Sequence, residues 1–370
     1  MLTKTDLFQA GDHGYHIYRV PGISVSPGGV VLAYVEARLE TASDWADIDI
    51  LMRRSLDGGQ SWEPAVKVVD HADFGPGPAN NFVTIPDRDT GEVHALHCHD
   101  YARVFYRASE DHGETFSDPL EITDVLAEFR SEYDWGVCAV GPGHGIQLDN
   151  GRLLAPIWLS ESHTHAHRPN RAAVIYSDDH GATWQRGDMV PDTIPCCNET
   201  EAVQLADGRV LLNMRNMGEG RRRAVTVSND DVHDWAEPWH DDELPEPRCF
   251  GSIHRLTKEG EDDRNRILFS NPDVWDTLED NPIDWGDRRD VTVRLSYDEC
   301  ETWPVKRRLQ EGPSGYSDLA VLPDSTVLCI YERGRVEGGH TASNRFMTVA
   351  HFDLEWLTEG ADSITEEKSR

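Results

Sequence analysis

Lysine, closely spaced cysteines and long apolar runs are scarce in this chain of 370 residues. No stretch of about 18 consecutive apolar residues occurs, and the amino-terminal segment MLTKTDLFQAGDHGYHIYRV lacks the apolar stretch of a signal peptide. We therefore expect a soluble, cytoplasmic protein. The seven cysteines show no CxxC spacing, and only Cys196 and Cys197 are adjacent, so the pattern does not predict a disulfide scaffold.

Positive charge is also in short supply. Thirty-five basic residues stand against sixty-seven acidic ones, which gives a formal net charge of -32, and only five of the basic residues are lysines. Such a surface repels phosphate backbones and anionic lipid headgroups, so we expect neither a nucleic-acid partner nor a membrane partner. An acidic, lysine-poor composition indicates adaptation to concentrated salt, where screening removes the self-repulsion.

A short motif of the form S-x-D-x-G-x-[ST]-aromatic recurs along the chain. Its copies are Ser55–Trp62, Ser109–Phe116, Ser177–Trp184 and Ser296–Trp303, with a degenerate copy at Ser228–Trp235. The aspartate can accept backbone N–H bonds across a bend, the glycine tolerates positive φ, and the aromatic ring can pack back between strands. The motif therefore predicts a structural turn and not a catalytic element.

A second repeat has the pattern of a β-hairpin, with a turn between two strands. Six copies begin near residues 23, 82, 145, 202, 252 and 319. Most are followed by a second strand pair closed by the S-x-D-x-G turn, so each unit has four strands. Six units predict an all-β fold, a six-bladed β-propeller with four antiparallel strands per blade, over residues 1–358, followed by an acidic tail at 359–370 that we expect to be frayed.

This topology predicts which side chains meet. In each blade the start of the first strand, the end of the second and the start of the third lie at one mouth of the propeller. The charged or phenolic residues at these positions are Arg19, Arg38, Asp44, Glu199, Arg215, Arg288, Tyr316 and Glu332. Converging arginines in an acidic protein indicate a ligand with a carboxylate, which guanidinium groups bind in bidentate geometry.

These residues carry a resemblance to the exo-α-sialidases (neuraminidases) of bacterial and animal type. Tyr18-Arg-Val-Pro21 is similar to the family's Y/F-R-I-P motif, and the S-x-D-x-G turns are similar to its Asp-boxes (BNR repeats). The resemblance continues through the segments 36–38, 44–54, 141–145, 198–215, 288–294 and 315–319, and covers essentially the whole chain.

The resemblance implies a role for each residue. Arg19, Arg215 and Arg288 would bind the carboxylate of sialic acid, although Arg289 is an alternative to Arg288. The other implied roles are the general acid/base for Asp44, the nucleophile for Tyr316, the base that activates it for Glu199, a buttress of Arg19 for Glu332, and contact with the sugar's ring substituents for Arg38.

The implied reaction is hydrolysis of a terminal α-ketosidic bond with retention, on a sialylated glycan substrate. A tyrosine suits this reaction because the anomeric carbon carries a carboxylate, which would repel a carboxylate nucleophile. Asp44 would be protonated in the resting complex, would donate to the leaving oxygen and would then activate water.

Alternatives remain open. A related nonulosonic acid is an alternative substrate, and a non-catalytic glycan-binding propeller or a scaffold for protein partners is an alternative function, since Asp-boxes also occur in propellers without this activity. Histidines at 163, 165 and 167, and at 94, 97 and 99 beside Cys98 and Asp100, suggest metal binding. The resemblance requires no metal or other cofactor and implies no obligate protein partner, so we expect none.

The acidic composition generates a prediction about salt. The Debye length falls from about 30 Å at 0.01 M salt to about 3 Å at 1 M, so added salt screens the self-repulsion of the folded state. We expect the melting temperature to rise from low to molar KCl or NaCl, with activity persisting at the molar end. Thermal melts and initial rates across this range are the measurement. A flat or falling melting temperature would contradict the prediction.

Overall fold

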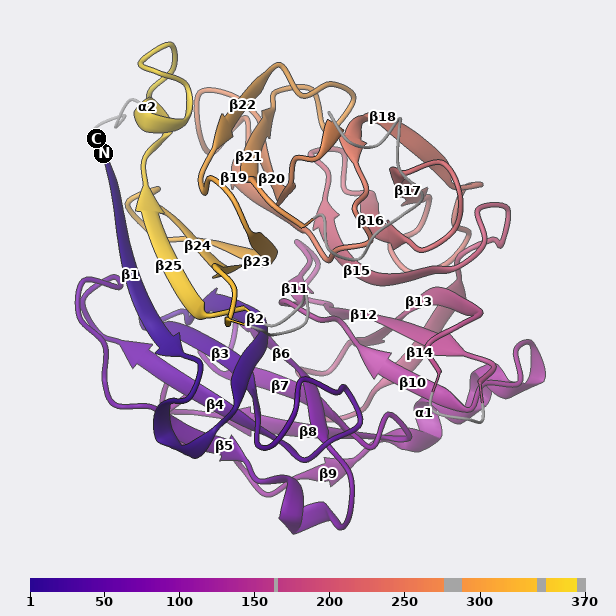
Figure 1. Cartoon of the computed structure of the whole chain (residues 1–370). Coiled ribbons are helices and arrows are strands. Elements are labelled where there is room, and N and C mark those ends of the chain that lie inside the picture. Colours follow the sequence, from indigo (N-terminus) through magenta and orange to yellow (C-terminus); the bar gives the residue numbers. More distant parts are fainter. Residues whose placement is uncertain (163–165, 276–287, 338–343, 365–370) are drawn as a thin grey trace.

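The computed structural model describes residues 1–162, 166–275, 288–337 and 344–364, and these form a ring of six antiparallel β-sheets (Figure 1). The predicted six-bladed β-propeller is therefore confirmed. The helical elements within these ranges are short: η1 (Asp12–Gly14), η2 (His71–Phe74), α1 (Thr123–Ala127), η3 (Glu128–Ser131) and α2 (Leu354–Leu357). None of the helices in these ranges has the length and apolar character needed to span a bilayer.

The first three blades follow one another along the chain. Blade 1 contains β2 (Ile17–Val25), β3 (Val31–Arg38), β4 (Ile48–Ser55) and β5 (Val66–Val69). Blade 2 contains β6 (Ala79–Pro86), β7 (Val93–His99), β8 (Arg103–Ser109) and β9 (Leu120–Glu121). Blade 3 contains β10 (Val137–Val140), β11 (Ile146–Gln147), β12 (Leu153–Ser160), β13 (Asn170–Ser177) and β14 (Gln185–Met189). Its inner strand is divided into β10 and β11, so this blade differs from the expected four strands.

The last three blades complete the ring. Blade 4 contains β15 (Cys197–Gln204), β16 (Val210–Asn216), β17 (Arg222–Ser228) and β18 (Trp239–Pro245). Blade 5 contains β19 (Ser252–Thr257), β20 (Arg266–Pro272), β21 (Val291–Ser296) and β22 (Val305–Arg308). Blade 6 contains β23 (Ser314–Val321), β24 (Val327–Arg333), β25 (Phe346–Phe352) and the amino-terminal strand β1 (Leu2–Gln9).

The ring is closed by the pairing of the two ends of the chain. Strand β1 runs antiparallel beside β25, with Leu2 opposite Phe352 and Gln9 opposite Phe346 (Figure 1). The sequence repeat did not identify β1 as the outer strand of blade 6. Asp362, beyond the boundary expected at residue 358, is buried and accepts two hydrogen bonds from Arg266, at 2.8 and 2.9 Å.

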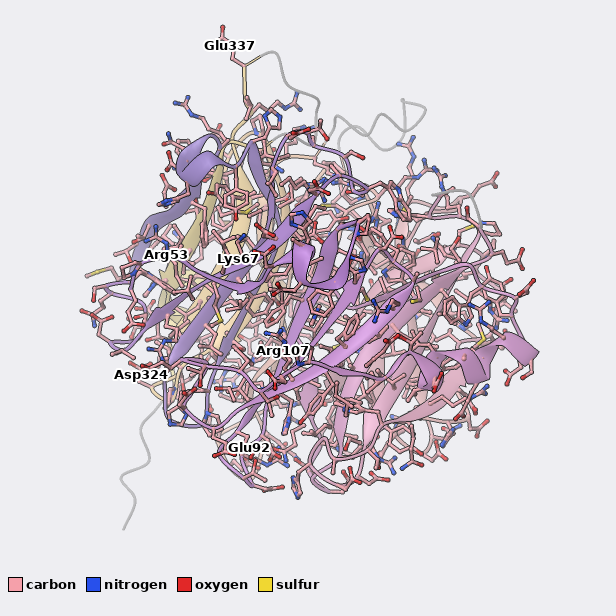
Figure 2. All side chains as sticks on the ribbon, turned by 90° about the horizontal axis from the view of Figure 1, so that it is seen from below. Arg53, Lys67, Glu92, Arg107, Asp324 and Glu337 are labelled. Carbon is pink, nitrogen blue, oxygen red and sulfur yellow. The ribbon has the colours of Figure 1, made fainter. Side chains whose placement is uncertain are left out.

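The apolar core lies between neighbouring blades. In one cluster, Leu32 and Met52 of blade 1 pack with Val93 and Ala95 of blade 2. The turns between first and second strands reach one face, and the connections between second and third strands reach the other. Figure 2 shows the molecule from the side, with Glu92 of the β6–β7 turn near one face and Glu337, which follows β24, at the opposite one.

The four S-x-D-x-G motifs form equivalent turns between third and fourth strands. In the first, Ser55 Oγ donates to Asp57 Oδ1 at 2.8 Å and accepts from the Gly59 amide at 2.7 Å, while the Ser61 amide donates to Asp57 at 2.8 Å. The other three copies repeat these bonds, and the fifth residue has positive φ in all four, including Cys300 at 72°. The predicted structural role of the motif is confirmed.

A polar network runs along the propeller axis. It contains a buried side chain from the inner strand region of each blade: Ser24, Thr84, His144, Glu201, Ser252 and Asp318. His144 Nδ1 lies 2.8 Å from Asp318 Oδ1 and 3.3 Å from Glu201 Oε1. At Gly143, an added Cβ would lie 1.9 Å from Glu201 Oε1, which explains the glycine before His144.

The charges of this network are set by burial and by the close approach of three ionisable groups. Burial disfavours the charge on His144, but Glu201 and Asp318 outweigh it and raise the pKa of the imidazole well above its usual value. Burial raises the pKa of Glu201 to about 8, whereas His144 holds the pKa of Asp318 below its usual value despite burial. We therefore expect a charged His144–Asp318 pair beside a protonated Glu201 at neutral pH.

The raised pKa of Glu201 predicts a loss of stability as the pH rises. The folded state keeps this proton up to about pH 8, whereas an unfolded glutamate loses it near pH 4.3. The contribution of Glu201 to the free energy of unfolding is therefore complete at low pH. It falls as the pH rises between these two values, by at most about 1.4 kcal/mol per pH unit. Glu201→Gln, which imitates the protonated form, should reduce this slope.

Chemical denaturation of the wild type and of Glu201→Gln from pH 5 to 8 is the measurement. Glu110→Gln, at an exposed position of an S-x-D-x-G turn, is the matched control and should leave the slope unchanged. Parallel pH profiles for the wild type and Glu201→Gln would contradict the assigned charge state.

Candidate active site

A cavity of about 560 Å³ opens at the mouth formed by the starts of the inner strands. The cavity is lined by residues from the strands or connecting loops of all six blades: Arg19, Val20, Ala42, Ser43, Asp44, Trp45, Asn81, Tyr101, Trp158, Ala166, His167, Arg168, Asn198, Glu199, Arg215, Met217, Arg288 and Tyr316. Six of the eight residues expected at this mouth therefore line one cavity, and Arg38 and Glu332 lie behind it.

Irregularities in the inner strands occur where these strands meet the cavity. The strand register shifts between Arg19 and Gly22 in β2, and equivalent shifts occur around residues 80–83, 197–200 and 314–317 of β6, β15 and β23. A β-bulge bends its strand and re-aims a side chain. Val20 (φ 51°) and Asn81 (φ 53°) have left-handed backbone conformations, which are strained for a β-branched residue such as valine.

Tyr316 and Glu199 form a close pair at the floor of the cavity. The Tyr316 hydroxyl donates to Glu199 Oε1 at 2.6 Å and accepts from Arg215 Nη1 at 2.8 Å, and Arg215 Nη1 also lies 2.5 Å from Glu199 Oε2. Burial raises the pKa of the Tyr316 phenol well above its usual value, despite the opposing charge of Arg215. The phenol is therefore neutral, with a carboxylate in position to accept its proton.

Three arginines surround the ring of Tyr316. Their guanidinium carbons lie 5.2 Å (Arg19), 5.9 Å (Arg215) and 5.1 Å (Arg288) from the ring centroid. Arg289 instead pairs with Asp290 at 2.8 Å and lines a separate groove beside Lys306. Arg288, and not Arg289, therefore faces the cavity.

Glu332 holds Arg19 from behind. Its Oε1 accepts from Arg19 Nε at 3.0 Å, and its Oε2 accepts from the Tyr316 amide at 3.2 Å and from Asn344 Nδ2 at 2.7 Å. Burial disfavours the charge on Arg19, but Glu332 outweighs it and raises the pKa of Arg19. The expected contact between Glu332 and Arg19 is therefore present, and it extends to the backbone of Tyr316.

Arg38 lies beneath Asp44 instead of facing the cavity. Only 1% of its side chain is exposed, and Nη2 lies 2.8 Å from Glu36 Oε2 and 2.7 Å from Asp44 Oδ1. Its guanidinium thus pairs with Glu36 and Asp44, and the expected contact of Arg38 with a sugar's ring substituents stays a prediction. Burial would raise the pKa of the Asp44 carboxyl, but Arg38 and Arg19 outweigh it and lower the pKa.

An aromatic wall, consisting of Trp45, Tyr101, Trp158 and His167, lines the cavity beside Asp44. The ring centroids of Trp45 and Tyr101 are 4.6 Å apart, and those of Tyr101 and His167 are 4.9 Å apart. The sequence interpretation missed this wall and also Asn81 and Asn198. A signal existed for three of these residues, since Trp45 and Asn198 adjoin expected site residues and Asn81 lies on an inner strand.

Two of the described histidines that suggested a metal, His94 and His97, have different partners. His94 lies 2.8 Å from the Tyr106 hydroxyl, whereas His97 stacks on Phe105 with centroids 5.3 Å apart. His163 and His165 fall outside the described residues. Among the described residues, the groups with ligand atoms close enough for a metal are Asp49/Asp70/His71, Asp87/Asp89/His180 and His144/Glu201/Asp318, and none of these residues lines the cavity.

Known proteins share both the sequence pattern and the fold. The model of the BNR repeat-like domain matches residues 29–329. The chain is 30% identical to a sialidase of Micromonospora viridifaciens, over 96% of this chain and 54% of that protein. It is 29% identical to Sialidase-2 of Cricetulus griseus, over 91% and 93% of the two chains. The solved structure of the Hadza microbial sialidase Hz136 superposes with a TM-score of 0.80 at 26% identity, covering 96% of this chain and 69% of that one.

The length covered differs among the relatives. The chain spans 54% of the Micromonospora protein and 61% of a sialidase of Bacteroides fragilis, so those relatives contain further sequence. The match nevertheless extends over nearly the whole of this chain, and the family model covers most of the propeller. The chain therefore belongs to the sialidase family of BNR-repeat proteins.

Proposed function

We propose that the protein is a retaining exo-α-sialidase, which hydrolyses terminal α-ketosidically linked sialic acid, or a close nonulosonic acid, from glycoconjugates. The observation that carries the proposal is the 2.6 Å hydrogen bond from Tyr316 to Glu199 within a group of three arginines. A phenol paired with a base supplies a nucleophile, and converging guanidinium groups suit a substrate carboxylate.

The arginines orient the substrate. A carboxylate bound by Arg19, Arg215 and Arg288 would lie over the Tyr316 ring, because all three guanidinium groups surround that ring. The anomeric carbon carries this carboxylate and would therefore come close to the Tyr316 hydroxyl. A neutral phenol approaches it without the repulsion that a carboxylate nucleophile would experience.

Two displacements account for the reaction. In the first, the Tyr316 oxygen attacks the anomeric carbon and its proton passes to Glu199, while Asp44 donates a proton to the departing glycosidic oxygen. In the second, Asp44 accepts a proton from water, the water oxygen attacks the anomeric carbon, and the Tyr316 oxygen leaves with a proton returned by Glu199. Two inversions give retention.

The protonation of Asp44 depends on the substrate in this scheme. In the free site, Arg38 and Arg19 lower the pKa of Asp44, which opposes the expectation of a protonated resting acid. A substrate carboxylate beside Arg19 would neutralise part of this positive charge and exclude water from Asp44. Both effects raise the pKa of the carboxyl, so binding itself would favour the protonated acid.

Retention is the first outcome to measure. Proton NMR during hydrolysis of a fluorogenic α-ketoside of sialic acid should show the α-anomer of the released sugar before mutarotation. Tyr316→Phe, which removes only the nucleophilic oxygen, is the control and should produce neither anomer. Initial β-anomer would overturn the retaining mechanism, and no release from a panel of ketosides with different acyl groups would favour a glycan-binding propeller.

The second outcome to measure concerns binding of the substrate carboxylate. Arg215→Leu should remove about 2–5 kcal/mol of substrate binding, because it deletes one partner of a buried charge pair. The wild type should also bind the methyl ester of the substrate poorly. Arg255→Leu is the control for the loss of an arginine. Arg255 lies 2.6 Å from Glu299, and neither residue lines this cavity. Equal turnover of acid and ester by the wild type would contradict the assigned role of the arginines.

A further inference from the structure

A buried ion pair lies behind the arginines of the cavity. Arg223 of β17 and Glu246, which follows β18, are 0% and 1% exposed in their side chains, and Arg223 Nη1 lies 2.8 Å from Glu246 Oε2. Arg223 also donates from Nε to Asn213 Oδ1 at 2.7 Å and from Nη1 to the Cys249 carbonyl at 3.0 Å. Neither side chain lines the cavity, and the proposed reaction does not use them.

Glu246 binds the backbone beside Arg215. Its Oε2 accepts from the amide of Asn216, the residue after Arg215, at 3.1 Å. The negative charge of Glu246 also favours the charged form of Arg215 and contributes to its raised pKa, although burial opposes this. Glu246 therefore affects both the position and the charge of Arg215.

The same carboxylate shapes the turn that meets Arg288. Glu246 Oε1 accepts from the Cys249 amide at 2.9 Å and so closes the 246–249 turn. Within this turn, Arg248 has a left-handed backbone conformation (φ 56°), which requires support from its surroundings. The Arg248 carbonyl accepts a hydrogen bond from Arg288 Nη2.

We propose that Glu246 is a positioning residue that couples Arg215 to Arg288. The Glu246 carboxylate is neutralised by Arg223. Its Oε2 fixes the backbone of β16 at Asn216, the residue after Arg215, and its Oε1 fixes the 246–249 turn, which accepts a hydrogen bond from Arg288. The proposal rests on the proposed function for its kinetic consequence, although the positioning itself is a structural property. A glutamine at this position has a single acceptor oxygen, so it can satisfy only one of the two amides.

The test compares Glu246→Gln with a matched control. Asp362→Asn also removes a buried carboxylate from an arginine, since Asp362 accepts two hydrogen bonds from Arg266. Both variants should lose stability. Only Glu246→Gln should raise KM for the acid substrate, by about 10- to 100-fold, because small misplacements of binding groups have effects of this size. Its kcat should change little, since the carboxylate is bound in ground state and transition state alike.

The methyl ester of the substrate tests whether the change concerns binding of the carboxylate by the arginines. The preference of the enzyme for the acid over its methyl ester should narrow in Glu246→Gln and remain unchanged in Asp362→Asn. Arg223→Lys is the alternative if Glu246→Gln does not fold. A lysine keeps the charge beside Glu246 but loses the bonds that Nε and Nη2 of Arg223 make to Asn213. Its looser hold on Glu246 should therefore also raise KM. An unchanged KM in the folded variant would overturn the proposal.

Crystal structures of the variants separate this inference from the proposed function. In Glu246→Gln, or in Arg223→Lys if that variant is used, the 246–249 turn should shift and the bond from Arg288 to the Arg248 carbonyl should be lost. An unmoved turn with the Arg288 bond intact would overturn the coupling. A wild-type protein without activity on any α-ketoside would contradict the proposed function, whereas the crystal structures would still test the positioning.

Discussion

The arrangement of the cavity depends on the electrostatic cost of holding several guanidinium groups together. Arg19, Arg215 and Arg288 all lie within 6 Å of one tyrosine ring, measured from the guanidinium carbon to the ring centroid. Such a group of like charges is stable away from water only with compensating carboxylates nearby. Glu332 is in contact with Arg19 behind the cavity, and Glu199 is in contact with Arg215 in the cavity wall. The fold thus supplies a negative charge to each of these two arginines.

This compensation requires the ring to be closed. Arg19 comes from blade 1 and Glu332 from blade 6, and they meet only because the first and last blades are neighbours. Blade 6 in turn needs β1, the amino-terminal strand, which pairs with β25 (Figure 1). The pairing of the chain ends therefore supports the blade that provides both Tyr316 and the partner of Arg19.

Local patterns predicted much of the fold. The S-x-D-x-G turns could be recognised because all their hydrogen bonds lie within a few residues, as between Ser55, Asp57 and Gly59. The six hairpins followed from their repeated spacing, and the repeat then located the positions that meet at one mouth. Arg19, Asp44, Glu199, Arg215, Arg288 and Tyr316 line one cavity for this reason.

The remaining features depend on contacts distant in sequence. The left-handed conformations of Val20 and Asn81 arise where the inner strands bulge, and no local signal requires them. Arg38 was expected to face the ligand, since its position along β3 resembles that of Arg215 along β16. Its guanidinium pairs with Glu36 and Asp44 behind the cavity, and its contact with a ligand stays a prediction. Glu246 gave no signal, because Arg223 and Asn216 become its neighbours only after blade 4 has formed.

The carboxylates of the site thus have different environments that suit different tasks. Glu246 and Glu332 are buried against arginines and backbone amides, which hold both carboxylates in place. Asp44 has 41% of its side chain exposed, and its Oδ1 lies 2.7 Å from Arg38 Nη2. Its proton affinity therefore depends on what occupies the cavity. A carboxylate that changes its protonation during a reaction needs this sensitivity to its surroundings. A carboxylate that holds an arginine in place needs surroundings that stay the same.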